Sequence, residues 1–193
     1  INPVKALGLK VVNLVPPAIL VGEDVIRGAR MQELAFMVAK STYLLLPQHF
    51  LTIIDDAYET RKARLAGTFY TLSKLANPAA QVKHDPGLLK HFTETIPDGD
   101  RAEFMKMITE MSKDPARHLD ISSWLVSVEH TANRLGLLFA NDLESAARII
   151  KGEASGISKA SVQDRVRELV VYSLSSEYFQ LRKALGFSLD SQR

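Results

Sequence analysis

The sequence has no cysteine. Disulfide bonds, iron–sulfur clusters, cysteine-ligated zinc and thiol catalysis are therefore excluded. Proline and glycine are also scarce, with eight and ten residues in a chain of 193. A sandwich or barrel of many short strands needs many tight turns, so this composition does not favour an all-β fold.

Long apolar runs are missing as well. The longest, Leu14 to Gly22, is interrupted by Pro16 and Pro17 and is far shorter than the ~18 residues of a membrane span. We therefore expect no membrane-spanning segment. An excess of one charge is equally absent, because 24 basic residues stand against 22 acidic ones, a net charge of +2. This balance provides no chain-wide attraction for nucleic acid or anionic lipid.

Several catalytic signatures are absent from the chain. It contains no Walker phosphate loop, no dinucleotide-binding glycine pattern and no G-x-S-x-G elbow of a serine hydrolase. No two of the five histidines are three or four residues apart, as a helical zinc site would require; they are His49, His84, His91, His118 and His130. We expect these histidines to be exposed or to cap helices, and we expect no cofactor.

The pattern that is present is mainly helical. The segment "LKVVNLVPPAILVG" is β-branched and short, and it predicts two small strands over 10–13 and 18–21. The helical period follows from Met31 onward, with a stripe of apolar residues over 121–139 as its clearest part. The other expected helices are 31–46, 51–76, 87–96, 100–113, 143–151, 162–174 and 176–185. The prediction is a single, mainly α domain over 1–193, with a small β element near the N-terminus and an internal linker, 152–161, before the last two helices.

Individual residues carry local predictions. Asp120 and Ser161 are expected to be N-caps, and Asn141 with Glu144 resembles a capping box. The basic cluster at Arg61, Lys62 and Arg64 is typical of a solvated helix face. Trp124 and three methionines are expected to be core or helix-packing residues, although a partner groove is an alternative for them; the methionines are Met105, Met107 and Met111.

One segment resembles a known family. In "SVEHTANRLGLLFANDLESAARII", the residues Glu129-His130-Thr131-Ala132-Asn133-Arg134 resemble the E-x-x-A-D-R helix of HtpX-like gluzincin zinc metallopeptidases, with Asn133 in place of Asp. Upstream, "PAILVGEDVIRGARMQELAFMVAK" resembles the segment that leads into the H-E-x-x-H helix of those enzymes. By this alignment the five motif positions are occupied by Lys40, Ser41, Thr42, Tyr43 and Leu44.

The resemblance implies a gluzincin-like scaffold whose zinc site has been lost. In the family the Glu corresponding to Glu129 is the third zinc ligand. Zinc catalysis also needs two histidines and a glutamate base, and here those positions hold Lys40, Leu44 and Ser41. We therefore expect no catalytic residue and no metal, with Glu129 as a vestigial ligand position. His130 is a poor substitute, because it points about 100° away from Glu129 around the helix.

Glu129 itself has two interpretations. It could be a surface glutamate at the border of the apolar stripe. Alternatively, it could form an ion pair with Lys40 that fills the vacated metal centre, since the two positions would face each other across the helices of the ancestral site.

A second resemblance is to domains at the C-terminal ends of large bacterial tetratricopeptide-repeat proteins. The chain shares their ending, "YSLSSEYFQLRKALGFSL", and it begins with Ile1 rather than Met. The resemblance implies a C-terminal fragment of a longer repeat protein. The absence of cysteine fits a reducing cytoplasm, and we expect a bacterial cytoplasmic location. Together these features favour a non-catalytic pseudo-peptidase-like module that binds a protein partner or the upstream repeats, with the strand over 18–21 as a candidate edge for peptide. The alternatives are a hydrolase or metallopeptidase with rearranged catalytic groups and, less favoured, a nucleic-acid-binding module.

Overall fold

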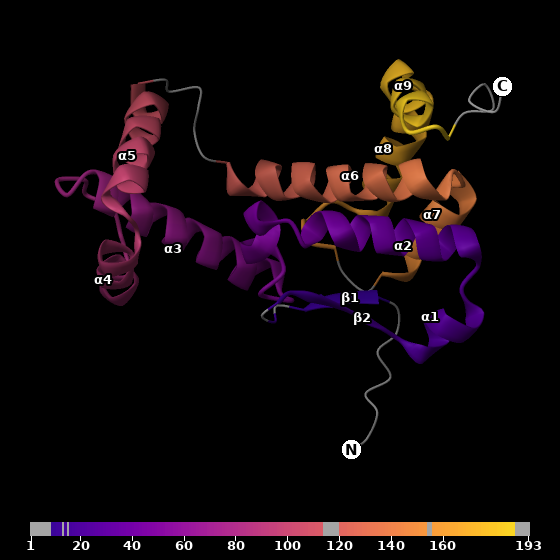
Figure 1. Ribbon diagram of the computed structural model, residues 1–193, viewed down its shortest axis with the longest axis horizontal. Coiled ribbons are helices and arrows are strands. Elements are labelled where there is room, and N and C mark those ends of the chain that lie inside the picture. The colour runs from indigo at the N-terminus through magenta and orange to yellow at the C-terminus, as the bar shows by residue number, and fades with distance from the viewer. Residues whose placement is uncertain (1–8, 13, 15, 114–119, 154–155, 188–193) are drawn as a thin grey trace. The chain divides into compact units, whose positions relative to one another are not determined.

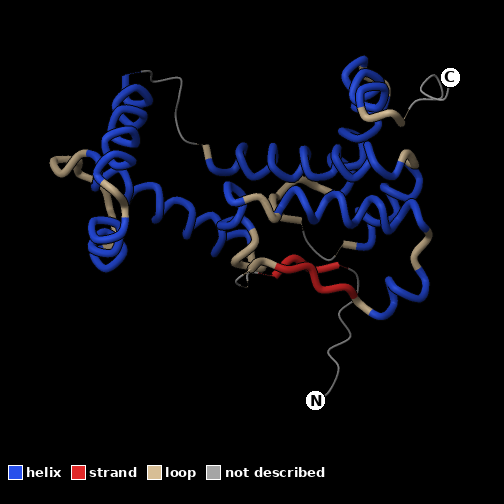
Figure 2. Tube along the Cα trace, in the orientation of Figure 1, coloured by secondary structure: helices blue, strands red, loops and turns tan. Residues whose placement is uncertain are grey.

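The computed structural model describes residues 9–12, 14, 16–113, 120–153 and 156–187. The predicted fold class is confirmed, because the described chain is mainly helical and carries one small antiparallel sheet near the N-terminus (Figures 1 and 2). The chain divides into two compact units, unit 1 (Ile1–Asp56 with Trp124–Arg193) and unit 2 (Ala57–Ser123). That all 193 residues form a single domain stays a prediction.

The sheet has two strands, β1 (Leu9–Val12) and β2 (Ala18–Val21), which pair with Leu9 opposite Val21. Their positions agree with the prediction except at Asn13, which lies outside the described residues. β1 also packs against α2 (Met31–Leu44), as Figure 1 shows. A further short helix, α1 (Glu23–Gly28), follows β2 and was not predicted.

Unit 1 is otherwise helical. After α2 comes a 3₁₀ helix, η1 (Pro47–Thr52), which begins at the proline that ends the α-helical period. The remaining helices lie within about one residue of their predicted ends; they are α6 (Ile121–Ala140, in unit 1 from Trp124 onward), α7 (Leu143–Gly152), α8 (Val162–Ser173) and α9 (Ser176–Ala184).

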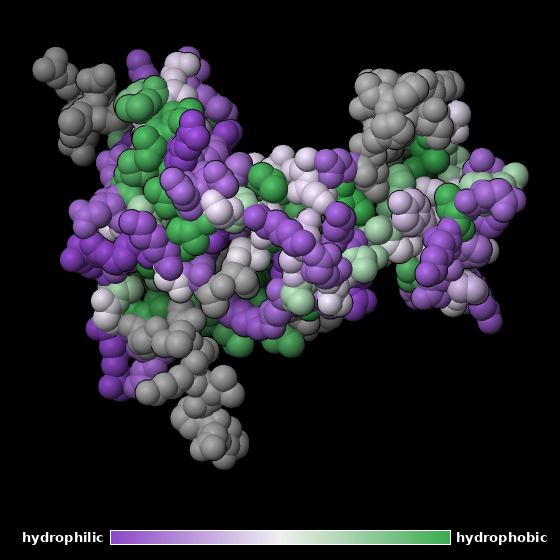
Figure 3. Space-filling model, turned by 180° about the vertical axis from the view of Figure 1, so that it is seen from behind, coloured by the Kyte–Doolittle hydropathy of each residue, from purple (hydrophilic) through white to green (hydrophobic). Residues whose placement is uncertain are grey.

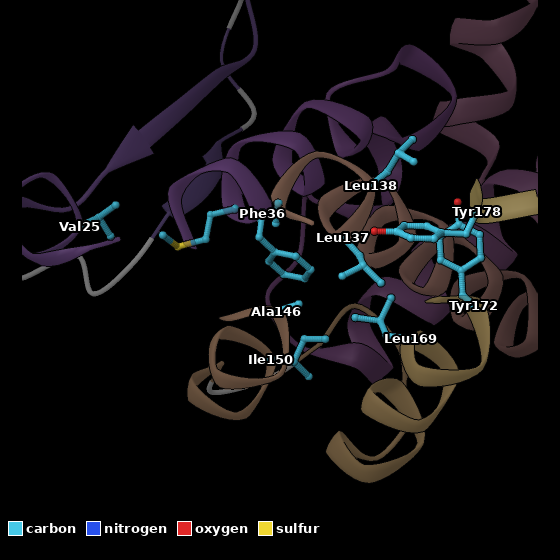
Figure 4. Close-up of a cluster of buried hydrophobic side chains, with 11 residues drawn as sticks. Val25, Phe36, Leu137, Leu138, Ala146, Ile150, Leu169, Tyr172 and Tyr178 are labelled. Carbon is cyan, nitrogen blue, oxygen red and sulfur yellow. The ribbon is translucent and has the colours of Figure 1, made fainter. Parts of the chain in front are cut away.

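The core of unit 1 lies where α2, α6, α7 and α8 meet. Figure 4 shows their side chains pointing toward one another; fully buried members are Phe36, Leu137, Ala146, Ile150 and Leu169. Gly136 makes the close approach of two helices possible, because a Cβ built there would lie 2.7 Å from the Phe36 ring. A second apolar cluster joins Leu44 of α2 to Val128 and Ala132 of α6. Since Phe36 meets Gly136 and Leu44 meets Val128, α2 and α6 run in opposite directions along each other.

Unit 2 contains α3 (Tyr58–Ala76), α4 (Pro86–Thr95) and α5 (Asp98–Lys113). The prediction of one helix over 51–76 is wrong at its start, because the chain leaves η1 and turns before α3 begins. The solvated face predicted for the basic cluster of α3 is wrong for Arg61, which is buried.

The core placement is wrong for three residues, because Trp124, Met105 and Met107 are 37%, 42% and 52% exposed. Helix packing stays a prediction for them. The side chain of Met111 lies outside the described part of the chain. No helix among the described residues is long and apolar enough to cross a membrane.

The capping predictions are confirmed at two of three places. Asp120 accepts the amides of Ser122 and Ser123, and Ser161 accepts the amide of Asp164. The capping box at Asn141 is wrong, because the next residue, Asp142, accepts the Glu144 amide. Asn141 instead ends α6 with a positive φ of 51°, a conformation that asparagine tolerates better than most residues.

Candidate functional site

Four charged side chains gather beside the α2–α6 pair. They come from four different places in unit 1: Lys40 lies on α2, Glu129 on α6, Glu153 directly after α7, and Arg165 on α8. We call this group the buried charge cluster. Its side chains are 13%, 1%, 23% and 3% exposed, in the same order. Two cations and two anions balance each other, as burial of charge requires.

The contacts run through the buried charge cluster as a chain. Lys40 Nζ lies 2.5 Å from Glu153 Oε1, and Arg165 Nη1 lies 2.7 Å from the other Glu153 oxygen. The same Arg165 nitrogen lies 3.3 Å from Glu129 Oε1. Glu153 is therefore shared by both cations, and Arg165 is shared by both carboxylates.

The connection between α7 and α8 completes the surroundings of Glu129. The backbone amide of Ile157 donates to Oε1 and that of Ser158 to Oε2, each at a distance of 3.2 Å. The Ser158 hydroxyl also donates to Oε2. With the Arg165 guanidinium, Glu129 accepts from four donors. A carboxylate offers about four lone-pair sites, so none of them is left for another ligand.

Neither interpretation of Glu129 agrees with its surroundings. The surface glutamate is wrong, because Glu129 is 1% exposed. The direct ion pair with Lys40 is also wrong, because Lys40 pairs with Glu153. The chain of contacts from Lys40 to Glu129 runs through Glu153 and then Arg165. The physical reason is the chain that follows α7: it brings a second carboxylate and a guanidinium into the space between the two predicted partners.

Sequence reasoning missed Glu153, Ser158 and Arg165. The segment 152–161 was expected to be only a linker, yet the described part of it supplies a carboxylate, two amides and a hydroxyl to the buried charge cluster. One signal could have identified Arg165. It lies on the face of α8 that also carries Leu169 and Tyr172, at i, i+4 and i+7, and a charge on an apolar face needs a buried partner.

The aligned motif positions, 40–44, form the last part of α2. Ser41 is buried, Leu44 packs against Val128 and Ala132, and Thr42 is exposed with its hydroxyl donating to the Val38 carbonyl. The Tyr43 ring lies 4.5 Å from the ring of His49, centroid to centroid. The structure therefore brings the segment 40–44 beside the helix of Glu129, but Leu44 meets it through apolar contact.

His49 does not have the predicted surroundings. His49 is 6% exposed, so the expectation of an exposed or capping role is wrong for it, and burial lowers the pKa of its imidazole. His118 lies outside the described residues.

On α6, Asn133 is fully buried, and within the described chain neither of its amide atoms, nor His130 Nε2, has a hydrogen-bond partner. Arg134 pairs with Glu168 of α8 at 2.5 Å and lies over the Tyr172 ring.

A second ion pair joins α2 to α7. Arg148 of α7 lies 2.7 Å from Glu33 Oε1, while the amide of Arg30 donates to the other Glu33 oxygen. The Arg30 amide and the Arg148 guanidinium hold the pKa of Glu33 below its ordinary value. This pair fixes α7, and with it the start of the segment that carries Glu153, against α2.

The electrostatics of the buried charge cluster do not suit a metal. A cation at Glu129 would have to displace or approach the Arg165 guanidinium, and like charges at this distance in a buried place repel strongly. In the part of the chain that the structure describes, no three His, Asp or Glu side chains lie close enough together to share an ion. Comparisons with protein-family models, with curated proteins and with solved structures give no match to this chain.

Proposed function

We propose that this chain is a non-catalytic module on a gluzincin-like scaffold, and that it acts in protein interaction or as a structural domain of a bacterial tetratricopeptide-repeat protein in the cytoplasm. The observation that carries the proposal is the saturation of Glu129. Four donors, one of them the cationic Arg165, occupy the carboxylate that the resemblance aligns with a zinc ligand. A carboxylate held in this way stabilises the fold and has no lone pair left for a metal.

The arrangement of the helices supports the scaffold part of the proposal. The segment aligned with H-E-x-x-H and the segment aligned with E-x-x-A-D-R are far apart in sequence, but they lie side by side on α2 and α6. A zinc site between two helices needs this arrangement. Here Lys40 is paired with Glu153, and Leu44 is part of an apolar cluster.

The β2 edge supports the interaction part. β2 pairs with β1 on one side, and no third strand pairs with it among the residues that the structure describes. Leu20 and Val21 are 48% and 43% exposed. An open edge with half-exposed apolar side chains can add an extended peptide through main-chain hydrogen bonds. In this proposal the chain holds peptide at that edge and does not cleave it.

Metal analysis of the purified chain tests the proposal. We expect substoichiometric zinc after incubation with zinc and desalting, and no hydrolysis of a casein substrate. The variant Glu129→Gln, compared with the exposed Glu177→Gln, is expected to change stability without changing metal content. One zinc per chain, lost together with hydrolysis in Glu129→Gln but retained in Glu177→Gln, would contradict the proposal and favour the rearranged hydrolase.

The β2 edge has a test of its own. A labelled peptide of alternating valine and threonine should bind, as measured by fluorescence anisotropy. The same peptide with N-methyl groups on alternate amides should bind far more weakly, because it cannot form the ladder with β2. Equal binding of both peptides would show that the edge does not add a strand.

A further inference from the structure

A groove lies on unit 1 between the end of α7 and α8. It is an open hollow with a volume of about 590 Å³. Its floor is a row of valines on α8, Val162, Val166 and Val170, which are four residues apart. Their spacing covers about 12 Å along the helix, or roughly two turns.

The three valines are only partly buried by the described chain. Val162 and Val166 pack their inner sides against the core of unit 1, and Val170 is 39% exposed. Apolar exposure continues along α8 and into α9, where Val171, Leu174 and Phe179 are 65%, 77% and 59% exposed. Figure 3 shows hydrophobic side chains gathered over this end of unit 1. The row therefore presents an apolar strip that the described chain does not cover.

The rim of the groove is basic, and its polar side chains have no partner within the described residues. Lys151 comes from α7, and Gln163 and Arg167 come from α8; all three are exposed, and none of them forms a hydrogen bond or ion pair with the described chain. The carboxylates of α8 are engaged elsewhere, since Asp164 accepts from Ser161 and Glu168 pairs with Arg134. No carboxylate lines the groove.

We propose that this groove binds an acidic amphipathic helix of a partner protein, and this inference rests on the proposed interaction function. The apolar strip requires side chains at i, i+4 and i+8 of the bound helix, which is how helices are recognised in grooves. The two cations come from different helices, Lys151 from α7 and Arg167 from α8, and they favour carboxylates beside that stripe. The aliphatic floor has no aromatic ring on which a nucleic-acid base could stack.

The experiment uses the whole chain and a synthetic alanine-based peptide of about 16 residues, long enough to form a helix. The peptide carries three leucines at spacing four, flanked by glutamates. Matched peptides carry glutamine or lysine in place of glutamate. Fluorescence anisotropy at low and high salt gives the affinities. We expect the glutamate peptide to bind best and to weaken with salt.

Variants of the chain connect binding to the groove. Arg167→Glu should weaken the glutamate peptide about fivefold, the size of one exposed ion pair. The double variant Lys151→Glu/Arg167→Glu should prefer the lysine peptide. Val170→Asn should weaken every peptide, while Lys183→Glu, an exposed charge reversal on α9 outside the groove, should change nothing. All substituted positions are exposed, and thermal unfolding confirms that each variant is folded.

Several outcomes would overturn the inference. Equal affinity for the glutamate and glutamine peptides, or full affinity in Arg167→Glu, would show that charge does not select the ligand. A dimer in sedimentation that Val170→Asn dissociates would assign the groove to a second copy of this chain. Binding to anionic vesicles without peptide binding would assign it to a lipid surface. None of these outcomes concerns zinc or hydrolysis, so failure here is distinct from failure of the non-catalytic function.

Discussion

Gly156 lies so close to Glu129 that no side chain fits between them. A Cβ built at Gly156 would overlap the Glu129 carboxylate, so any substitution must push the segment away from the hydrogen bonds that Ile157 and Ser158 donate. We expect Gly156→Ala to lower the free energy of unfolding by about 2 kcal/mol or more, because a buried carboxylate loses donors. Urea unfolding measures this effect.

The control for Gly156 is on the same segment. A Cβ at Gly152, the last residue of α7, meets nothing within 4 Å. Gly152→Ala should leave stability unchanged or raise it slightly, since alanine is the better helix residue by roughly 0.5–1 kcal/mol. Equal effects of both substitutions on the free energy of unfolding would show that the contact between Gly156 and Glu129 is not the cause of the loss.

The members of the buried charge cluster should differ sharply when removed singly. Arg165→Met leaves two carboxylates, Glu129 and Glu153, without their shared cation, so we expect a loss of about 3 kcal/mol or more. Lys40→Met leaves Glu153 still paired with Arg165, so it should cost less than Arg165→Met. Chemical denaturation of the two variants gives the order, and an equal or reversed order would refute the arrangement described.

His49 should make stability depend on pH. Burial lowers the pKa of its imidazole below the ordinary 6.5, so the unfolded chain binds the proton more readily. The contribution is present above pH 6.5 and is lost as pH falls through the folded pKa. Stability of the wild type measured by thermal unfolding at several pH values should decline in this window. His49→Gln should flatten that decline, whereas the exposed His91→Gln should leave it unchanged.

The start of α7 shows how one residue decides an element. Asp142 accepts the amide of Glu144 and the hydroxyl of Ser145, and these donors lower its pKa. Asp142→Ala should destabilise unit 1 by about 1 kcal/mol, the usual value of an N-cap. Asp142→Asn keeps an acceptor and should lose less. If alanine and asparagine were equivalent in thermal unfolding, the side chain would not be acting as the cap.

Most elements could be predicted from the sequence because their patterns are local. The stripe over 121–139 and the caps at Asp120 and Ser161 identify α6 and α8 closely. The start of α3 was missed because the apolar period continues through Leu51–Ile54, where the chain turns under tertiary constraints. The cap of α7 was missed by one residue, because a positive φ at Asn141 is invisible in sequence spacing.

The candidate site was harder to predict than the helices. The family resemblance pointed to the two segments around Lys40 and Glu129, and these segments lie side by side in the structure. It did not identify their partners, because ion pairing depends on residues that approach from elsewhere in the chain, 113 positions away for Lys40 and 36 for Glu129. The apolar period predicts which face of a helix is buried, but it does not predict which segment packs against that face.

At the scale of the whole molecule, the two units differ in how much apolar surface they bury. The buried apolar side chains of the described chain belong overwhelmingly to unit 1; those of unit 2 are Ala76, Ile108 and Ile121. The buried polar residues of unit 2 include Thr71 and Ser73, whose hydroxyls donate to carbonyls of their own helix. Hydrogen bonds of this kind replace bonds to water and contribute little net stability.

This difference predicts unequal local stability. Regions with few buried apolar contacts open with low free energy, and their amides exchange quickly. α4 should exchange fastest among the described helices, because none of its residues is buried. The second half of α6, which carries Leu137 and Leu138, should exchange slowest. Hydrogen exchange followed by mass spectrometry resolves both segments. If α4 were as strongly protected as α6, unit 2 would draw its stability from something other than its own buried side chains, and a bound partner would be the first candidate.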